Sequence, residues 1–150
     1  MKKIGLAVLI ALTGIQFIQP ARNEHGQALL TDISKIVSIP GEVQSLLQTA
    51  CYDCHSNNTN YPWYANIQPM GWLLANHIKN GKAELNFNEF GYYPARRQQS
   101  KLKSIASQVK DDEMPLASYT MLHENAKLTK DQKALIVDWA LQAKDSLEQK

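Results

Sequence analysis

The sequence predicts an all-α protein, and three observations lead to this prediction. Apolar residues recur at helical spacing in several segments, no segment has a confident strand pattern, and a capping box precedes the last apolar stripe. With 150 residues, of which 44% are hydrophobic, the chain is long enough for one compact domain. We expect a leading apolar segment over residues 1–20, a tether over 21–40 and a helical domain over 41–150.

The leading segment has the pattern of an export signal. Lys2 and Lys3 precede an apolar run from Ile4 to Ile18. As a helix this run measures roughly 22 Å, shorter than the ~30 Å hydrocarbon core of a bilayer, which favours a signal peptide. Residues 16–21 contain no A-x-A-like cleavage site, so an uncleaved membrane anchor is the alternative. Either way we expect an exported, periplasmic domain, soluble or anchored to the inner membrane.

Two helices are expected in the first half of the domain. One begins near Pro40, which suits the first helical turn, and continues into Cys51. The other begins at Pro69 and carries an apolar stripe that includes His77. The Asn-Gly pair at positions 80–81 is a natural end for this second helix.

Two further helices are expected after an irregular, aromatic-rich stretch over residues 82–94. A basic segment from about residue 95 to residue 110 has apolar residues at helical spacing and ends in an acidic loop that leads to Met114. The last helix is the clearest, because Thr129 and Gln132 form a capping box in front of its apolar stripe. The domain is therefore predicted to consist of helices and loops.

The most informative motif contains the two cysteines of the chain, in the run Cys51-Tyr52-Asp53-Cys54-His55. Two thiols three positions apart, followed directly by a histidine, form the attachment signature of a c-type haem. Positions i, i+3 and i+4 share one face of a helical turn, so the two thiols and the imidazole can address one flat ligand. The motif predicts one haem c per chain, attached through Cys51 and Cys54, with His55 on the iron.

Two other interpretations of this motif fit less well. A redox dithiol normally opens a helix within a thioredoxin-like βαβ pattern, and no β-branched strand pattern flanks Cys51 and Cys54. A structural zinc site normally has four ligands, and the chain offers neither a second cysteine pair nor an H-x3-5-H group. The formal net charge of +2 includes basic residues of the leading segment, so no basic surface for nucleic acid is indicated.

The second iron ligand must come from a short set of residues. The candidates are Met70, Met114, Met121, His25, His77 and His123. Met114 is preferred, because Pro115 stiffens its loop and a rigid loop can aim a thioether at iron. His77 is the main rival, although its apolar helix face also suits a core residue or a haem propionate partner. His123 and Met121 follow, Met70 is assigned to the core, and an open sixth position remains an alternative.

Other residues are candidates for the haem surroundings. Arg96, or its neighbour Arg97, can pair with a haem propionate, although adjacent arginines on a helix are commonly only solvated. Tyr61, Trp63 and Tyr64 can donate hydrogen bonds, but we expect this aromatic loop mainly to form an apolar wall of the pocket.

These motifs together resemble the haem-binding domain family of small exported monohaem proteins related to cytochrome c. The resemblance extends over about residues 41–142, and the tyrosine-proline-tryptophan-tyrosine run beside the haem motif makes it more specific. It is carried by Cys51–Ser56, Thr59, Tyr61–Tyr64, Ile67–Pro69, His77-Ile78, Gly81, Leu85–Phe87, Met114-Pro115, Tyr119, His123, Ala126, Leu128, Ile136 and Trp139. The resemblance implies a covalent c-type haem and a cytochrome c-like helical fold, and it does not decide between Met114 and His77.

These features predict a one-electron carrier rather than an enzyme. Histidine and methionine together hold haem iron in both oxidation states, and methionine raises the reduction potential. The alternative is a haem-based sensor or a peroxidase-like enzyme with an open or displaceable sixth position, in which His77 or His123 serves as a distal acid or base. The expected partners are redox proteins and the haem-attachment machinery, with a membrane tether if the leading segment is retained.

Overall fold

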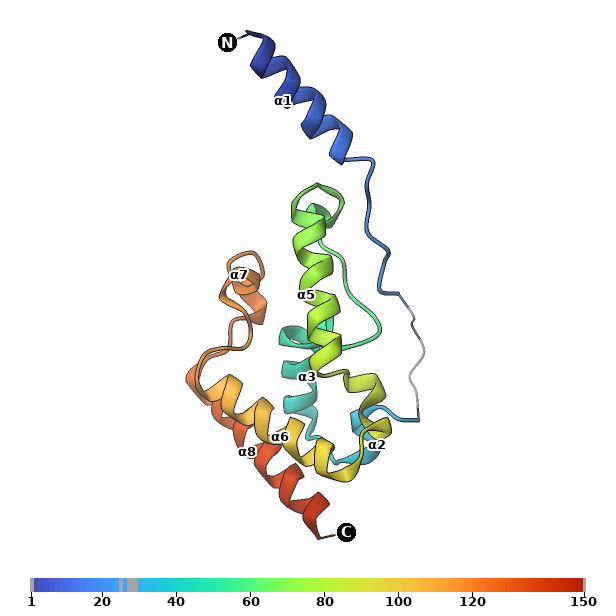
Figure 1. Ribbon diagram of the computed structural model, residues 1–150. Coiled ribbons are helices and arrows are strands. Elements are labelled where there is room, and N and C mark those ends of the chain that lie inside the picture. The colour runs from blue at the N-terminus through green and yellow to red at the C-terminus, as the bar shows by residue number, and fades with distance from the viewer. Residues whose placement is uncertain (1, 25, 27–29, 150) are drawn as a thin grey trace.

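The computed structural model describes residues 2–24, 26 and 30–149 and shows helices joined by turns and loops, without a β-strand among these residues (Figure 1). The prediction of an all-α fold is therefore confirmed over the described chain. In chain order the elements are α1 (Lys2–Ile15), α2 (Ile33–Ile36), α3 (Gly41–Ala50), α4 (Tyr52–His55), the 3-10 helix η1 (Trp63–Asn66), α5 (Met70–Glu84), the 3-10 helix η2 (Phe87–Tyr92), α6 (Ala95–Lys110), α7 (Ala117–Thr120), the 3-10 helix η3 (Glu124–Ala126) and α8 (Lys130–Glu148).

The main core is formed where α6 packs along α8, with α3 against α8 (Figure 1). Leu47, Leu102 and Ile136 are fully buried there. The side chains of Ile33 and Val37, from the segment expected to be a tether, are buried in the same core. The indole nitrogen of Trp139 on α8 donates a hydrogen bond to the carbonyl of Ser38, 3.0 Å away. Residues 33–38 are thus an integral part of the domain.

Of the two helices of the second half, α6 has the predicted bounds and α8 begins where predicted. α6 covers the predicted segment from residue 95 to residue 110. The hydroxyl of Thr129 accepts a hydrogen bond from the backbone of Gln132, whose side chain accepts one from the backbone of Thr129. The capping box is therefore confirmed.

The first predicted helix is interrupted before the haem motif. α3 ends at Ala50, and Cys51 leaves helical geometry with φ −128° and ψ −39° before α4 begins. The irregular stretch predicted after α5 contains the 3-10 helix η2, and the buried side chains of Phe87 and Phe90 hold it on the core.

The predicted end of the second helix at residues 80–81 is wrong, because α5 continues to Glu84. A Cβ atom on Gly81 would lie 2.7 Å from the carbonyl oxygen of Cys54. Gly81 therefore permits close packing of α5 on α4 instead of ending the helix.

The leading helix α1 projects from the domain and has no buried residue (Figure 1). In the part of the chain that the structure describes, no helix has both the length and the hydropathy needed to cross a membrane.

Candidate haem site

The attachment turn, residues 51–55, brings the three motif side chains to one cavity. The backbone N–H groups of Cys54 and His55 both donate to the carbonyl of Cys51, at 3.2 and 3.0 Å, which closes the turn. As the i, i+3, i+4 spacing predicts, Cys51, Cys54 and His55 line a common cavity of about 270 Å³.

The same turn lies between two apolar clusters. Cys51 packs against the main core, whereas Cys54 packs against a smaller cluster of Ala65, Leu74 and Ile78. The two thiols of the motif are therefore held from different sides of the fold.

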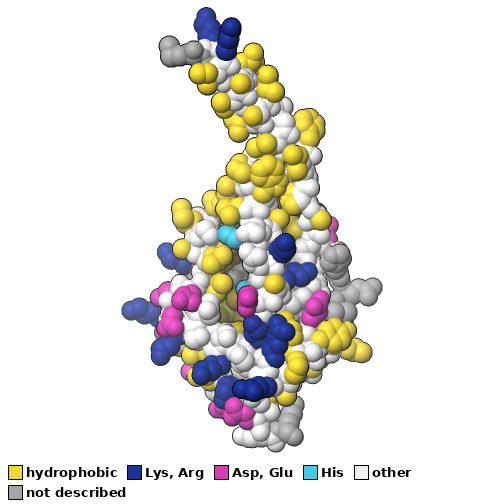
Figure 2. All heavy atoms as spheres, in the orientation of Figure 1, with side chains coloured by type: hydrophobic (Ala, Val, Ile, Leu, Met, Phe, Trp, Pro, Cys, Tyr) yellow, Lys and Arg dark blue, Asp and Glu magenta, His cyan; other side chains and the backbone are white. Residues whose placement is uncertain are grey.

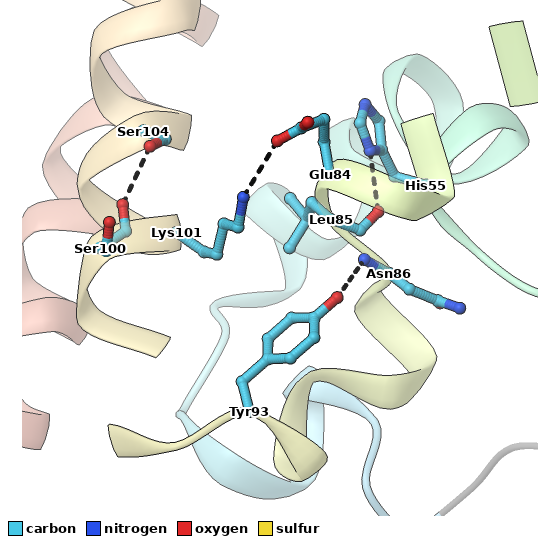
Figure 3. A network of polar contacts seen from close by, with 8 residues as sticks. All are labelled: His55, Glu84, Leu85, Asn86, Tyr93, Ser100, Lys101 and Ser104. Atoms are coloured by element: carbon cyan, nitrogen blue, oxygen red, sulfur yellow. Dashed lines mark hydrogen bonds and ion pairs between the residues drawn. The ribbon is translucent and has the colours of Figure 1, made fainter. Parts of the chain in front are cut away.

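The imidazole of His55 is oriented by the backbone at the end of α5. Its Nδ1 atom lies 3.0 Å from the carbonyl oxygen of Leu85 (Figure 3). A carbonyl only accepts hydrogen bonds, so Nδ1 carries the hydrogen and Nε2 keeps its lone pair. Burial lowers the pKa of His55, while the hydrogen bond to Leu85 and the nearby carbonyl of Gly81 act in the opposite direction. A neutral imidazole with a free Nε2 is the form that binds a metal.

The backbone segment that orients His55 is itself held by a hydrogen bond to a tyrosine. The hydroxyl of Tyr93 accepts a hydrogen bond from the N–H of Asn86, 2.9 Å away, directly after Leu85 (Figure 3). The Leu85 carbonyl that orients His55 thus belongs to a segment that is fixed at its next residue.

A second cavity of about 280 Å³ adjoins the first. The two cavities share Ala50, Cys51, His55, Glu84, Met114 and Pro115. Ile105 and Val109 of α6 add an apolar wall to the second cavity. The shared residues show that the two cavities join at His55 and Met114 into one hollow, and together they fall in the range of about 300–1,000 Å³ typical of ligand sites.

Both preferred candidates for the second iron ligand line this hollow. Met114 borders both cavities and is half-buried. His77 of α5 borders the first cavity and is half-buried rather than fully buried as its helix face suggested. The choice between Met114 and His77 stays open.

The other candidates lie elsewhere. Met121 is 81% exposed, and Met70, assigned to the core from the sequence, is 37% exposed. His123 stacks on the ring of Tyr119, with 4.1 Å between ring centroids, and lines neither cavity. His25 lies outside the described residues.

Burial makes both thiols weaker acids than an exposed cysteine thiol. It raises the pKa of Cys51 to about 12, with a smaller contribution from the charge of Cys54. It raises the pKa of Cys54 to about 11, with a smaller contribution from Asp53. A redox dithiol needs a lowered thiol pKa, so these surroundings argue against that interpretation of the motif. Among the described residues, no group of three or more histidine, cysteine or acidic side chains is placed to hold a metal ion.

The loop that carries Met114 is joined to the attachment turn by a tyrosine. The hydroxyl of Tyr119 donates a hydrogen bond of 2.6 Å to the carboxylate of Asp53, between the two cysteines. Burial and this bond raise the pKa of Tyr119. Tyr119 also lines the first cavity, a placement that the sequence alone does not indicate.

The cationic side chain at the hollow is Lys101, which sequence reasoning missed. Its ammonium lies 3.3 Å from the carboxylate of Glu84, another lining residue (Figure 3). Arg96 is exposed and outside both cavities, and Arg97 lies over the ring of Tyr93, 4.5 Å from its centroid. A sequence signal for Lys101 was available, because it shares one helix face with three other residues of α6 that line the cavity. With spacing i, i+3, i+4 and i+7, these residues are Lys101, Ser104, Ile105 and Gln108.

The aromatic loop lies beside the hollow rather than around it. Trp63 is 78% exposed, and the hydroxyl of Tyr61 accepts a hydrogen bond from the backbone of Asn23. Tyr64 lines a small separate hollow of about 30 Å³ together with His77. None of the three aromatic residues lines either of the two cavities that form the hollow.

Comparison with known families agrees with this site. A model of the haem-binding domain family matches residues 10–142, which is most of the chain and includes the attachment turn, Met114 and His77. No curated protein and no solved structure matches the chain. The chain therefore belongs to the haem-binding domain family.

Proposed function

We propose that this protein is an exported c-type monohaem protein that carries single electrons in the periplasm. The observation that carries the proposal is the hollow itself: two thiols and an oriented imidazole from one short turn share it with Met114. Membership of the haem-binding domain family supports haem as the cofactor. Covalent attachment and electron transfer are inferred from the chemistry of these residues.

The donor set of the hollow fits a c-type haem. Cys51 and Cys54 would hold the porphyrin as thioethers, and His55 would bind the iron through Nε2. Met114 would supply the ligand on the other face, with His77 as the alternative. When bound, the haem supplies reversible one-electron oxidation and reduction of its iron.

The walls of the hollow support an electron carrier. Ile105 and Val109 present apolar surface that excludes water, and a drier haem has a higher reduction potential. Lys101 of α6 lines the hollow beside Glu84 and would be the cation that pairs with a haem propionate. Its partners would be redox proteins, and the haem-attachment machinery during maturation.

Spectra of matched variants test the proposal. The full chain is co-expressed with a haem-attachment system, and intact mass is compared with that of the bare polypeptide. We expect a covalent haem increment and a low-spin spectrum that is lost in Met114→Ala and kept in His77→Ala. The opposite pattern would assign the second ligand to His77, and a colourless protein with the bare polypeptide mass would overturn the proposal.

The position of His77 favours one alternative function. A histidine beside the hollow can act as a distal acid or base if the sixth position is open or displaceable, as in a sensor or a peroxidase-like enzyme. This alternative predicts rapid binding of an added ligand to the ferrous protein and turnover of peroxide with a reduced donor. Absence of both in fully haem-loaded protein would exclude it.

A further inference from the structure

One end of the domain exposes a group of large apolar side chains, which we call the end patch. Its members are Trp63, Ile67, Met70, Leu73, Met121 and Leu122. Met70, Leu73 and Leu122 border the same small hollow, so two parts of the chain far apart in sequence meet there. A cluster of exposed apolar side chains on a small domain marks an interaction surface.

The segment that follows α1 is fastened to this same end. The side chain of Gln16 makes two hydrogen bonds with the backbone of Gln68, at 2.9 and 3.2 Å. The indole nitrogen of Trp72 donates to the carbonyl of Ile18, 2.8 Å away. These contacts hold residues 16–18 against Gln68 and Trp72, at the start of α5. Two members of the end patch, Ile67 and Leu73, are the sequence neighbours of these two residues.

Further along the same segment, Asn23 is also hydrogen-bonded to the domain. Asn23 is buried, and its side-chain amide donates to the carbonyl of Ser56 and to the hydroxyl of Thr59, both at 2.9 Å. The ammonium of Lys82 donates to the side-chain carbonyl of Asn23, 2.6 Å away. Residues 16–24 are thus part of the folded domain, and they fix where α1 leaves it.

The apolar surface of α1 is continuous with the end patch. Figure 2 shows hydrophobic side chains along α1 and on the adjacent end of the domain, while most charged side chains on this face lie toward the other end. Phe17 and Ile18, which are 84% and 62% exposed, lie in the segment that joins α1 to this end of the domain. A helix that is apolar all round needs apolar surroundings, and α1 has no buried residue in the domain.

We propose that the end patch lies on a lipid bilayer, with α1 retained and inserted into that bilayer. The exposed ring of Trp63 suits the interface between headgroups and acyl chains, where tryptophan is enriched. Arg22 and Lys79 line a shallow site beside Tyr61 and are placed to meet anionic headgroups. The hydrogen bonds of residues 16–24 set this orientation, which goes beyond the electron-carrier proposal.

Photochemical crosslinking tests this surface. The haem-loaded full chain carries benzoylphenylalanine in place of Trp63 or Met121, or in place of the exposed Lys103 on α6 as the matched control. It is reconstituted into vesicles of phosphatidylethanolamine and phosphatidylglycerol, irradiated and examined by intact mass. We expect at least about tenfold more lipid adduct from the two patch positions than from position 103.

Three outcomes would overturn the proposal: adducts with a second copy of the chain, equal lipid adducts at all positions, or a mature mass that lacks α1. Replacing Trp63 or Met121, both exposed, leaves the core intact, and the haem spectrum reports folding of each variant. The readout is a lipid mass increment, so a negative result for membrane contact can be distinguished from failure of haem attachment.

Discussion

The attachment turn and the loop that faces it are held in different ways. The turn is fixed on several sides: Leu85 orients His55, the hydroxyl of Thr59 donates to the carbonyl of Asp53 at 2.6 Å, and α5 packs closely at Gly81. The facing loop, residues 111–128, carries Met114 between the end of α6 and the short α7. Among the described residues, one side-chain hydrogen bond, from Tyr119 to Asp53, joins this loop to the turn.

In the haem-bound form that we propose, the two faces of the haem would therefore differ in stability. Ligation by His55 would belong to the packed part of the fold, whereas ligation by Met114 would depend on a loop with one side-chain hydrogen bond to the turn. We therefore expect exchange of the second ligand, between Met114 and His77 or an added molecule, to be the easier change.

The largest effect is expected from the attachment turn. The double variant Cys51→Ala, Cys54→Ala removes both thioether bonds, so we expect complete loss of covalently bound haem, measured by intact mass. Met114→Ala should keep the full covalent mass and change only the spectrum. Equal loss of covalent haem in both variants would contradict the contrast between the two faces.

Burial should make the thiols of the haem-free chain slow to react with alkylating reagents. With the pKa of Cys54 raised from 9.0 to about 11, its thiolate fraction at pH 8 is about a hundredfold lower than that of an unperturbed thiol. Alkylation of the folded, haem-free chain should be slower by about this factor than alkylation in denaturant, as measured by mass spectrometry.

The same shifts give the sign of the stability change. The folded state keeps thiol protons that the unfolded state loses, so the free energy of unfolding is undiminished below about pH 9 and decreases as pH rises from about 9 toward 11. Denaturant titrations at several pH values measure this decrease. The double variant Cys51→Ala, Cys54→Ala should lose the thiol contribution, and an unchanged pH dependence would count against the pKa shifts.

A smaller effect is expected at the packing contact behind the turn. Gly81→Ala places a Cβ atom 2.7 Å from the carbonyl oxygen of Cys54 and should lower the free energy of unfolding by about 1–3 kcal/mol. Gly41→Ala is the matched control, because nothing lies within 4 Å of the added atom. Denaturant unfolding should show Gly41→Ala unchanged or slightly more stable. A neutral Gly81→Ala would mean that α5 and α4 can separate without cost.

The smallest change in stability is expected from two tyrosine hydroxyls. Tyr119→Phe and Tyr93→Phe each remove one hydrogen bond and should each lower the free energy of unfolding by about 1 kcal/mol. Their spectra should differ, because Tyr119 ties down the loop of Met114 whereas Tyr93 supports the segment behind His55. We expect faster binding of an added iron ligand in Tyr119→Phe alone. The same rate in both variants would show that this tyrosine does not control the second ligand.

Sequence reasoning located the local elements of the site well and its surroundings poorly. The attachment motif lines one cavity, α6 has the predicted bounds, and the capping box at Thr129 is present. These features depend on residues within one or two helical turns of each other. Arg96 was named as a propionate partner, but Lys101 borders the hollow, because the packing angle of α6 decides which of its faces meets the site.

Predictions from local sequence patterns were also wrong where packing against a distant segment determines the role of a residue. Asn80-Gly81 has the pattern of a helix end, yet Gly81 lies within α5 because α4 packs against it. The aromatic loop has the composition of a pocket wall, yet Trp63 is exposed and belongs to the end patch.

The sequence by itself determined the helical class and the resemblance to the family, because both depend on residue patterns that can be recognised along the chain. Only the tertiary structure decided that Leu85 orients His55, that Met114 and His77 border the same hollow, and that residues 16–24 fasten α1 to the domain. The hydrogen bonds among these contacts join residues that are 30 or more positions apart. Their formation depends on how whole helices pack, which spacing along the chain does not specify.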